Sequence, residues 1–292
     1  MSTKAINYEQ ELAQANRRKK EPVSWTKLVL VSIMFLYLIL FLLVPLLFIF
    51  VKAFEQGAAV YFAAITERDA LSAIKLTLLV ALITVPVNTV FGIAAAWCIT
   101  KFQFRGKQLL LSIIELPFAV SPVIAGLVFI LLFSPSGALG PWITEWGIKV
   151  IFSVPGIVIA TIFITLPFIA RELIPVMQAQ GSAEEEAAIS LGANGWQMFL
   201  QVTLPSIKWG LIYGMILCNA RAIGEFGAVS VVSGRIRGMT NTMPLHVEIL
   251  YNEYQFAAAF AVASLMSLLA LVTLLVKTWI EWKSEKEQQI EG

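Results

Sequence analysis

Two residues of opposite charge, Arg221 and Glu225, interrupt the apolar stretch 210–232. They are four positions apart, so on a helix they share one face. Burying charge in a membrane is costly and usually has a reason. One interpretation is an ion pair that neutralises itself and lets both charges stay buried. The other is that this face lines a pathway in which Arg221 attracts a passing anion, while Gly224 and Gly227 let the helix bend or pack closely. The two interpretations are compatible.

A second candidate is the segment ELPFAVSPVIAGL, which begins at Glu115. Pro117 and Pro122 cannot donate a backbone hydrogen bond, so we expect them to kink or loosen the helix that contains them. Carbonyl groups freed at such a break face protein or a water-filled cavity rather than lipid. The segment is therefore either a gate or hinge, or a static kink needed for packing.

A polar segment, residues 184–205, lies between two apolar runs and predicts two short helices with a bend between them. Ser182 and Glu185 have the spacing of a capping box, and the three carboxylates of residues 184–186 suit the first turn of a helix. Gly192 can take the left-handed conformation that ends this helix.

The second helix of this segment is predicted to start at Asn194. Gln197 follows at the capping-box spacing. Pro205 is expected to prevent a smooth continuation into the next apolar run. A folded polar island in an apolar chain is most simply explained as a docking surface for a soluble partner.

The composition places these residues in a membrane protein. The chain is 58% hydrophobic and 14% charged, with a mean hydropathy of +0.80, which excludes a soluble domain. A helix needs about 20 apolar residues to cross a bilayer. We therefore predict an all-α polytopic protein with six transmembrane helices, at residues 28–51, 71–100, 109–133, 154–174, 210–232 and 256–280.

The distribution of Lys and Arg sets the expected orientation. Six spans put both termini on one side together with the polar segment, and that side carries basic clusters such as residues 17–20 and 101–107. The other side holds only Lys52, Arg68, Lys149, Arg235 and Arg237. We therefore expect a cytoplasmic N-terminal arm (1–26), a transmembrane domain (27–280) whose cytoplasmic loop covers about 176–208, and a cytoplasmic tail (281–292).

Several kinds of chemistry lack their residues. The chain has no GxxxxGK[ST] phosphate loop, so ATP hydrolysis would need another polypeptide. His246 is the single histidine, which makes a histidine metal site improbable and a simple loop residue the expected role. Cys98 and Cys218 lie in predicted spans and are expected to behave as small apolar residues. We expect no enzyme activity, no metal, no cofactor in this chain and no nucleic-acid partner.

The polar segment resembles the EAA loop of bacterial ABC-importer permeases. The pattern is Glu-Ala-Ala, three residues, Gly, nine residues, then Ile-x-Leu-Pro; here Val202 replaces the isoleucine. The resemblance implies the MetI-like permease fold, with this loop inserted as a coupling helix into a groove of a cytoplasmic ATPase that binds ATP and Mg²⁺. The implied coupling residues are Glu184, Glu185, Glu186, Ala187, Ala188, Gly192, Val202, Leu204 and Pro205.

The segments ARAIGEFGAVSVVSG and ELPFAVSPVIAGL, within a match over roughly residues 25–280, resemble permeases of oxyanion importers, most closely the CysW-type sulfate/thiosulfate permeases. The resemblance implies a bacterial inner-membrane importer of sulfate or thiosulfate. Its other parts would be a homologous CysT-type permease as heterodimer partner, two copies of a CysA-type ATPase and a periplasmic sulfate- or thiosulfate-binding protein. A molybdate or other oxyanion permease is the alternative, ahead of an ion-coupled secondary transporter or a membrane scaffold.

Overall fold

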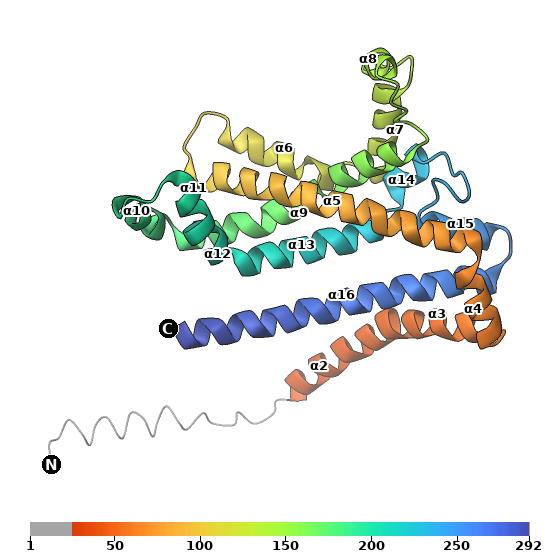
Figure 1. Ribbon diagram of the computed structural model, residues 1–292. Coiled ribbons are helices and arrows are strands. Elements are labelled where there is room, and N and C mark those ends of the chain that lie inside the picture. Colours follow the sequence, from red (N-terminus) through yellow and green to blue (C-terminus); the bar gives the residue numbers. More distant parts are fainter. Residues whose placement is uncertain (1–24, 292) are drawn as a thin grey trace. The chain divides into compact units, whose positions relative to one another are not determined.

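The computed structural model describes the backbone of residues 25–291 and the side chains of residues 25–283. The predicted N-terminal arm lies outside the described residues except for its last two. From 25 to 291 the chain forms helices and turns without a strand, which confirms the all-α expectation (Figure 1). It divides into two compact units, Met1–Ile49 and Phe50–Gly292.

The described part of the first unit is helical. α2 (Trp25–Leu38) continues through a π-helical turn, η1 (Ile39–Leu43), into α3 (Val44–Phe54). The N–H of Val44 bonds to the carbonyl of Ile39, five residues back, just before Pro45. Because Pro45 has no N–H to give, a wider turn at this point accommodates it without ending the helix.

The core of the second unit is formed by α5 (Arg68–Lys101), α9 (Val154–Gln180) and α13 (Lys208–Ile223), which pack against one another (Figure 1). Two glycines allow this approach. A Cβ on Gly92 of α5 would lie 2.6 Å from Ile169 Cγ2 of α9, and one on Gly214 of α13 would lie 3.2 Å from Ile169 Cα. Small residues at helix contacts are the usual device for close packing in a membrane.

A buried polar contact fixes how α5 and α9 are aligned. Asn88 of α5 is fully buried and donates to Thr165 Oγ1 at 2.7 Å and to the carbonyl of Ile162 at 3.2 Å, both in α9. In an apolar interior an amide without partners would cost several kcal/mol, roughly 2–7. The bonds therefore fix the register of α5 against α9.

Two of the six predicted spans are not continuous helices. Residues 109–133 form α6 (Lys107–Ala119) and α7 (Pro122–Phe133), which meet at an angle of 107°. Residues 210–232 form α13 and the short α14 (Gly227–Val232), separated at residues 224–226. Among the described residues four helices are long and apolar enough to cross a membrane, at Trp25–Phe54, Arg68–Lys101, Val154–Gln180 and Phe256–Lys283, or five if the bent pair counts as one. Six are not confirmed.

The remaining helices lie mostly at the end of the bundle opposite the polar segment (Figure 1). They are α4 (Ala58–Thr66), α8 (Gly140–Glu145) and α15 (Met243–Asn252), and the last helix, α16 (Phe256–Glu291), packs against α4, α13 and α15. His246 lies inside α15 and is 3% exposed, so the expectation of a loop residue was wrong.

Candidate functional site

The polar segment between α9 and α13 folds as a small helical unit at one end of the bundle (Figure 1). It comprises α10 (Ala183–Ser190), α11 (Gly195–Met198), the π-helical turn η2 (Phe199–Thr203) and α12 (Leu204–Ser206). Gly192 has φ +95°, as the predicted bend requires. Asn194 accepts from Gln197 N at 2.8 Å and its own N–H donates to Gln197 Oε1 at 3.0 Å, so the second capping box is confirmed.

The prediction of a capping box between Ser182 and Glu185 was wrong. Ser182 is the residue before α10, but its side chain makes no capping bond; its hydroxyl donates to Glu186 Oε1 instead. Glu185, the expected second member of the box, points toward other parts of the chain. The reason is that a cation and a hydroxyl on neighbouring elements offer its carboxylate better partners than the backbone N–H of the cap.

The break expected after Pro205 is present, because α12 ends at Ser206 and α13 begins only at Lys208. The N–H of Leu204 bonds to the carbonyl of Phe199, five residues back, so η2 widens just ahead of Pro205. This is the solution also seen before Pro45. The chain turns two residues later, at Ile207, where ψ is 2°.

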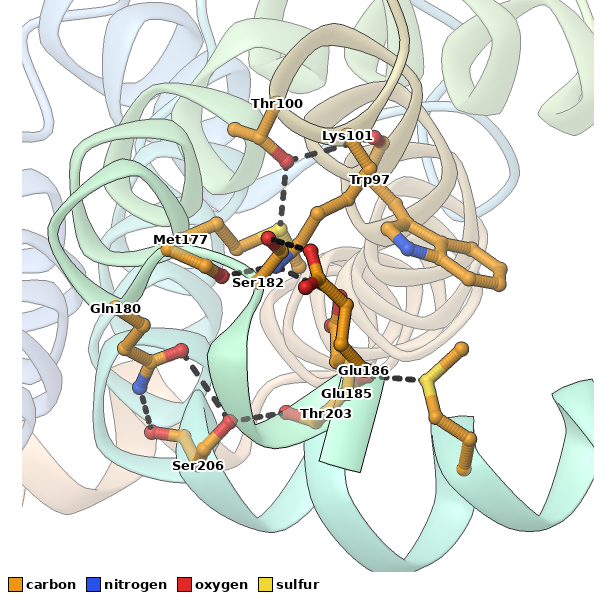
Figure 2. Close-up of polar contacts among 12 residues, drawn as sticks. Trp97, Thr100, Lys101, Met177, Gln180, Ser182, Glu185, Glu186, Thr203 and Ser206 are labelled. Atoms are coloured by element: carbon orange, nitrogen blue, oxygen red, sulfur yellow. Dashed lines mark hydrogen bonds and ion pairs between the residues drawn. The ribbon is translucent and has the colours of Figure 1, made fainter. Parts of the chain in front are cut away.

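Glu185 is the centre of a polar network on the inner side of α10 (Figure 2). Its Oε2 lies 2.8 Å from Lys101 Nζ, at the end of α5, with only 12% and 14% of the two side chains exposed. Its Oε1 accepts from Thr203 Oγ1 of η2 at 2.7 Å. Lys101 also donates to the carbonyl of Gly181. A buried carboxylate is stable when it is paired and hydrogen-bonded in this way.

The outer side of the same unit is apolar and open. Leu191 is 90% exposed and Trp196 69%, and Ile189 is exposed beside them. A groove of about 780 Å³ runs along α10 and α12, with Ala187 and Pro205 among its lining residues. Exposed apolar side chains on a folded polar element are a mark of a protein-interaction surface.

The predicted coupling residues therefore differ in whether their side chains face the interior of the chain or the solvent. Glu185 is turned inward, whereas Glu184, Glu186, Ala187, Gly192 and Pro205 are exposed and Ala188, Val202 and Leu204 are partly buried. The structure places all of them in one small unit.

Arg221 and Glu225 form the ion pair that their spacing suggested, with Nη1 and Oε2 2.7 Å apart. The two groups are close enough for an ion pair, but Glu225 Oε2 accepts no hydrogen bond from the Arg221 guanidinium. They do not share a continuous helix, because α13 ends at Ile223. Glu225 is 1% exposed and accepts from the N–H of Ala228 at 2.8 Å, so its carboxylate holds the first turn of α14.

The two helix breaks lie against each other. A Cβ on Gly227, the first residue of α14, would lie 2.7 Å from Pro122 Cβ, the first residue of α7. A Cβ on Gly126 of α7 would lie 2.9 Å from the carbonyl oxygen of Ala228. Pro122 thus belongs to the same region as Glu225, which sequence spacing alone did not indicate.

The other two candidate residues of the third predicted span, Glu115 and Pro117, lie apart from this region. Pro117 is buried within α6, and Glu115, two residues earlier, is exposed. In the part of the chain that the structure describes, no ion pair joins Glu115 to Arg221. The kink predicted from Pro117 and Pro122 is confirmed, because the helix breaks between them: α6 ends at Ala119, and α7 begins at Pro122 at an angle of 107°.

The remaining reactive residues are isolated. Cys98 and Cys218 are both free thiols. Burial lowers the pKa of His246, while the carboxylates of Glu67 and Asp69 oppose that shift and Arg237 adds to it. Within the described residues no group of three or more His, Cys, Asp or Glu side chains could hold a metal ion.

Sequence reasoning missed Lys101, Thr203 and Asn88. Lys101 entered only as one positive charge at the end of an apolar run, and no spacing rule links it to a carboxylate 84 positions further along the chain. Asn88 offered a signal that could have been used, since an amide in the middle of a predicted span needs partners on a neighbouring helix.

Comparison with known proteins identifies the family. A sequence model of the family described as "Binding-protein-dependent transport system inner membrane component" matches residues 88–285. The sulfate transport system permease protein CysW of Escherichia coli strain K12 is 50% identical over 279 residues, 96% of each chain. The sulfate transport system permease protein CysT of the same strain is 37% identical over 239 residues, 82% of this chain and 86% of the relative.

A solved structure supports the fold. One chain of a bacterial alginate ABC transporter, crystallised with an alginate pentasaccharide-bound periplasmic protein, superposes with a TM-score of 0.73 at 19% identity, over 87% of this chain and 92% of that one. At this identity the likeness concerns the fold alone. By the family match and the identity to its relatives, the chain belongs to the binding-protein-dependent transport system inner membrane components and, within them, to the CysW-type permeases.

Proposed function

We propose that this chain forms one half of the transmembrane pathway of an ATP-driven importer for sulfate or thiosulfate. The observation that carries the proposal is its 50% identity, over nearly its whole length, to a protein named as a sulfate permease. The cargo is thus a small tetrahedral anion with two negative charges. Arg221, with a third of its side chain exposed, is the candidate for attracting it.

The helical unit α10–α12 docks a separate ATPase that binds ATP and Mg²⁺. Its outer side supports this role, since Leu191 and Trp196 are large, apolar and exposed on an element that is too short and polar to enter the bilayer. The sequence has no phosphate loop of its own. This unit and both chain termini face the cytoplasm, in agreement with the distribution of Lys and Arg.

The complete importer contains four further polypeptides, one of which is the second half of the membrane pathway. A CysT-type permease is the expected partner half, because this chain is also 37% identical to a protein of that name. Two copies of a CysA-type ATPase and one periplasmic sulfate- or thiosulfate-binding protein complete the assembly. The binding protein supplies affinity, so the pathway needs only a weak, transient anion site.

The geometry supports alternating access in the following way. ATP binding moves the ATPases together and displaces α10, which is joined through α9 and α12 to the core of the bundle. The broken helices α7 and α14 touch where Gly227 meets Pro122, so a shift of one break displaces the other. A contact between two helix ends can change more easily than one between two continuous helices, because fewer backbone hydrogen bonds must adjust.

The test is uptake of radiolabelled sulfate by cells that lack every other sulfate importer and carry this chain with its neighbouring permease, ATPase and binding protein. We expect uptake that is lost when the ATPase is inactivated and is competed by thiosulfate but not by molybdate. Trp196→Glu and Leu191→Glu should abolish co-purification of the ATPase, whereas Trp142→Glu, equally exposed at the other end of the molecule, should not. Uptake that persists on a proton gradient without ATPase activity would refute the proposal, and competition by molybdate alone would change the cargo.

A further inference from the structure

The unusual feature of the coupling unit is that one of its three consecutive glutamates, Glu185, is turned inward and bonded to other helices of the chain. Both oxygens of Glu185 are engaged: Oε2 by Lys101 Nζ at 2.8 Å and Oε1 by Thr203 Oγ1 at 2.7 Å. Only 12% of its side chain is exposed. Glu184 and Glu186, in contrast, are exposed. Glu185 is therefore turned away from the surface that a docked protein would contact.

The contacts of Glu185 join three segments that are far apart in sequence. Lys101 ends α5, Glu185 lies in α10, and Thr203 ends η2, just ahead of the short connection to α13 (Figure 2). Lys101 also donates to the carbonyl of Gly181, at the turn from α9 into α10. One lysine and one carboxylate thus hold together the ends of α5, α9 and the segment that leads into α13.

Among these helices α5 has no short covalent connection to the coupling unit. α9 runs into α10 through Gly181, and α12 runs into α13 through Ile207. A neutral pair of bonds between Gln180 and Ser206, of 2.6 and 3.2 Å, closes the base of the unit between these two connections. The last turn of α5 reaches the unit through the Lys101–Glu185 pair and through a ring contact of Trp97 with Phe199, 5.1 Å between centroids. Of these two contacts, the ion pair is the one between specific charged atoms, whereas the ring contact is apolar.

We infer that the Lys101–Glu185–Thr203 network is the link that transmits movement of the coupling unit to α5. The inference rests on the proposed function and adds positioning residues to it. When a partner pushes α10, the carboxylate draws Lys101 with it, because separating a nearly buried ion pair would leave both charges without compensation. α5 then moves with α10, and its contacts with α9 and α13 carry the displacement through the membrane core.

The experiment measures anions imported per ATP hydrolysed in vesicles that contain the complete importer. Lys101→Met and Glu185→Gln are the test variants, and Lys101→Arg keeps the charge. Lys107→Met is the matched control, because Lys107 lies near the same end of the bundle and has no ion pair among the described residues. A cysteine at the outer end of α5 (Ser72→Cys, with Cys98→Ala and Cys218→Ala) reports, by its thiol reactivity with and without a nonhydrolysable ATP analogue, whether α5 moves.

For Lys101→Met and Glu185→Gln we expect about a tenfold loss in the number of anions imported per ATP, which corresponds to a typical coupling free energy. ATPase activity should stay within about twofold of wild type. The nucleotide response of the cysteine on α5 should disappear with it. Lys101→Arg should restore both, Lys107→Met should change neither, and the double variant Lys101→Met/Glu185→Gln should be no worse than either single one.

Three results would overturn the inference or separate it from the proposed function. An unchanged transport ratio together with an unchanged cysteine response would show that α5 moves without the link. Loss of ATPase from the purified complex in Lys101→Met and Glu185→Gln would make the pair a support of the docking surface instead. If the wild-type complex hydrolyses ATP but imports no sulfate, the proposed cargo is wrong; the cysteine response, which needs no cargo, still decides the link.

Discussion

Replacing Glu225 tests how the break between α13 and α14 is held. Its carboxylate accepts from the N–H of Ala228 at 2.8 Å and lies 2.7 Å from Arg221 Nη1. In Glu225→Ala both contacts disappear. Ala228 is fully buried, so its N–H is left without an acceptor, at a cost of about 1–3 kcal/mol.

The ion pair contributes less than a fully buried one, because a third of the Arg221 side chain is exposed and water can solvate it when the carboxylate is removed. We assign it about 1–2 kcal/mol, below the roughly 3–5 kcal/mol of a fully buried pair. Glu225→Ala should therefore lower the free energy of unfolding by about 2–5 kcal/mol, and Glu225→Gln, whose amide oxygen can still accept from Ala228, by about 1–2 kcal/mol.

The assay is SDS-driven unfolding of the purified chain in mixed micelles, followed by tryptophan fluorescence, with Arg221→Gln as the third variant. Arg221→Gln should cost more than Glu225→Gln, because it leaves the almost fully buried carboxylate of Glu225 without its cation, whereas Glu225→Gln leaves a guanidinium that water can reach. Equal losses for Glu225→Ala and Glu225→Gln would refute the role of that hydrogen bond. A loss for Arg221→Gln no larger than for Glu225→Gln would show that the charge of the buried carboxylate contributes little to the stability of the break.

Three further outcomes are expected. Gly192→Val should reduce ATPase stimulation by the loaded binding protein, because a β-branched residue at φ +95° costs about 1–2 kcal/mol, while Gly195→Ala, whose added Cβ meets nothing within 4 Å, should leave stimulation unchanged. Gly227→Val should lower the free energy of unfolding by about 1–3 kcal/mol, since its Cβ would lie 2.7 Å from Pro122 Cβ. The pKa of His246 is lowered from 6.5 in the folded chain, so as the pH falls the unfolded chain takes up the proton first. The free energy of unfolding should therefore fall as the pH drops below about 6.5. His246→Gln should remove that part of the pH dependence.

Local sequence rules succeeded where the cause of a structure lies within a few residues. The bend at Gly192 and the capping box of Asn194 and Gln197 were both predictable, because a glycine with positive φ and a cap four residues long need no distant partner. The same rule failed at Ser182, where Lys101 competes for the carboxylate of Glu185. Local rules give a correct result only until a distant charge offers a better bond.

The helix breaks show a second limit. Apolar length predicted a span over residues 210–232, yet Glu225 can satisfy the N–H of Ala228 and so stabilises a break that hydropathy does not register. The break at Pro122, in contrast, was expected from the missing N–H of a proline, and Pro122 stands at the first position of α7, where a proline is well placed. The break after Pro205 was also expected, but the wider turn of η2 just ahead of this proline was not.

The unequal exposure of Arg221 and Glu225 is compatible with both interpretations of their pairing. Glu225 is 1% exposed and bonded to the backbone, so it is a structural residue of the break. Arg221 keeps a third of its side chain exposed, and a guanidinium has five N–H donors, of which the pair occupies few. The buried carboxylate therefore holds the guanidinium in place and lowers the cost of keeping it at this depth, and in the proposed pathway the exposed part of Arg221 would meet the anion. A partly neutralised cation attracts a dianion weakly enough to release it, which is what a pathway requires and a storage site does not.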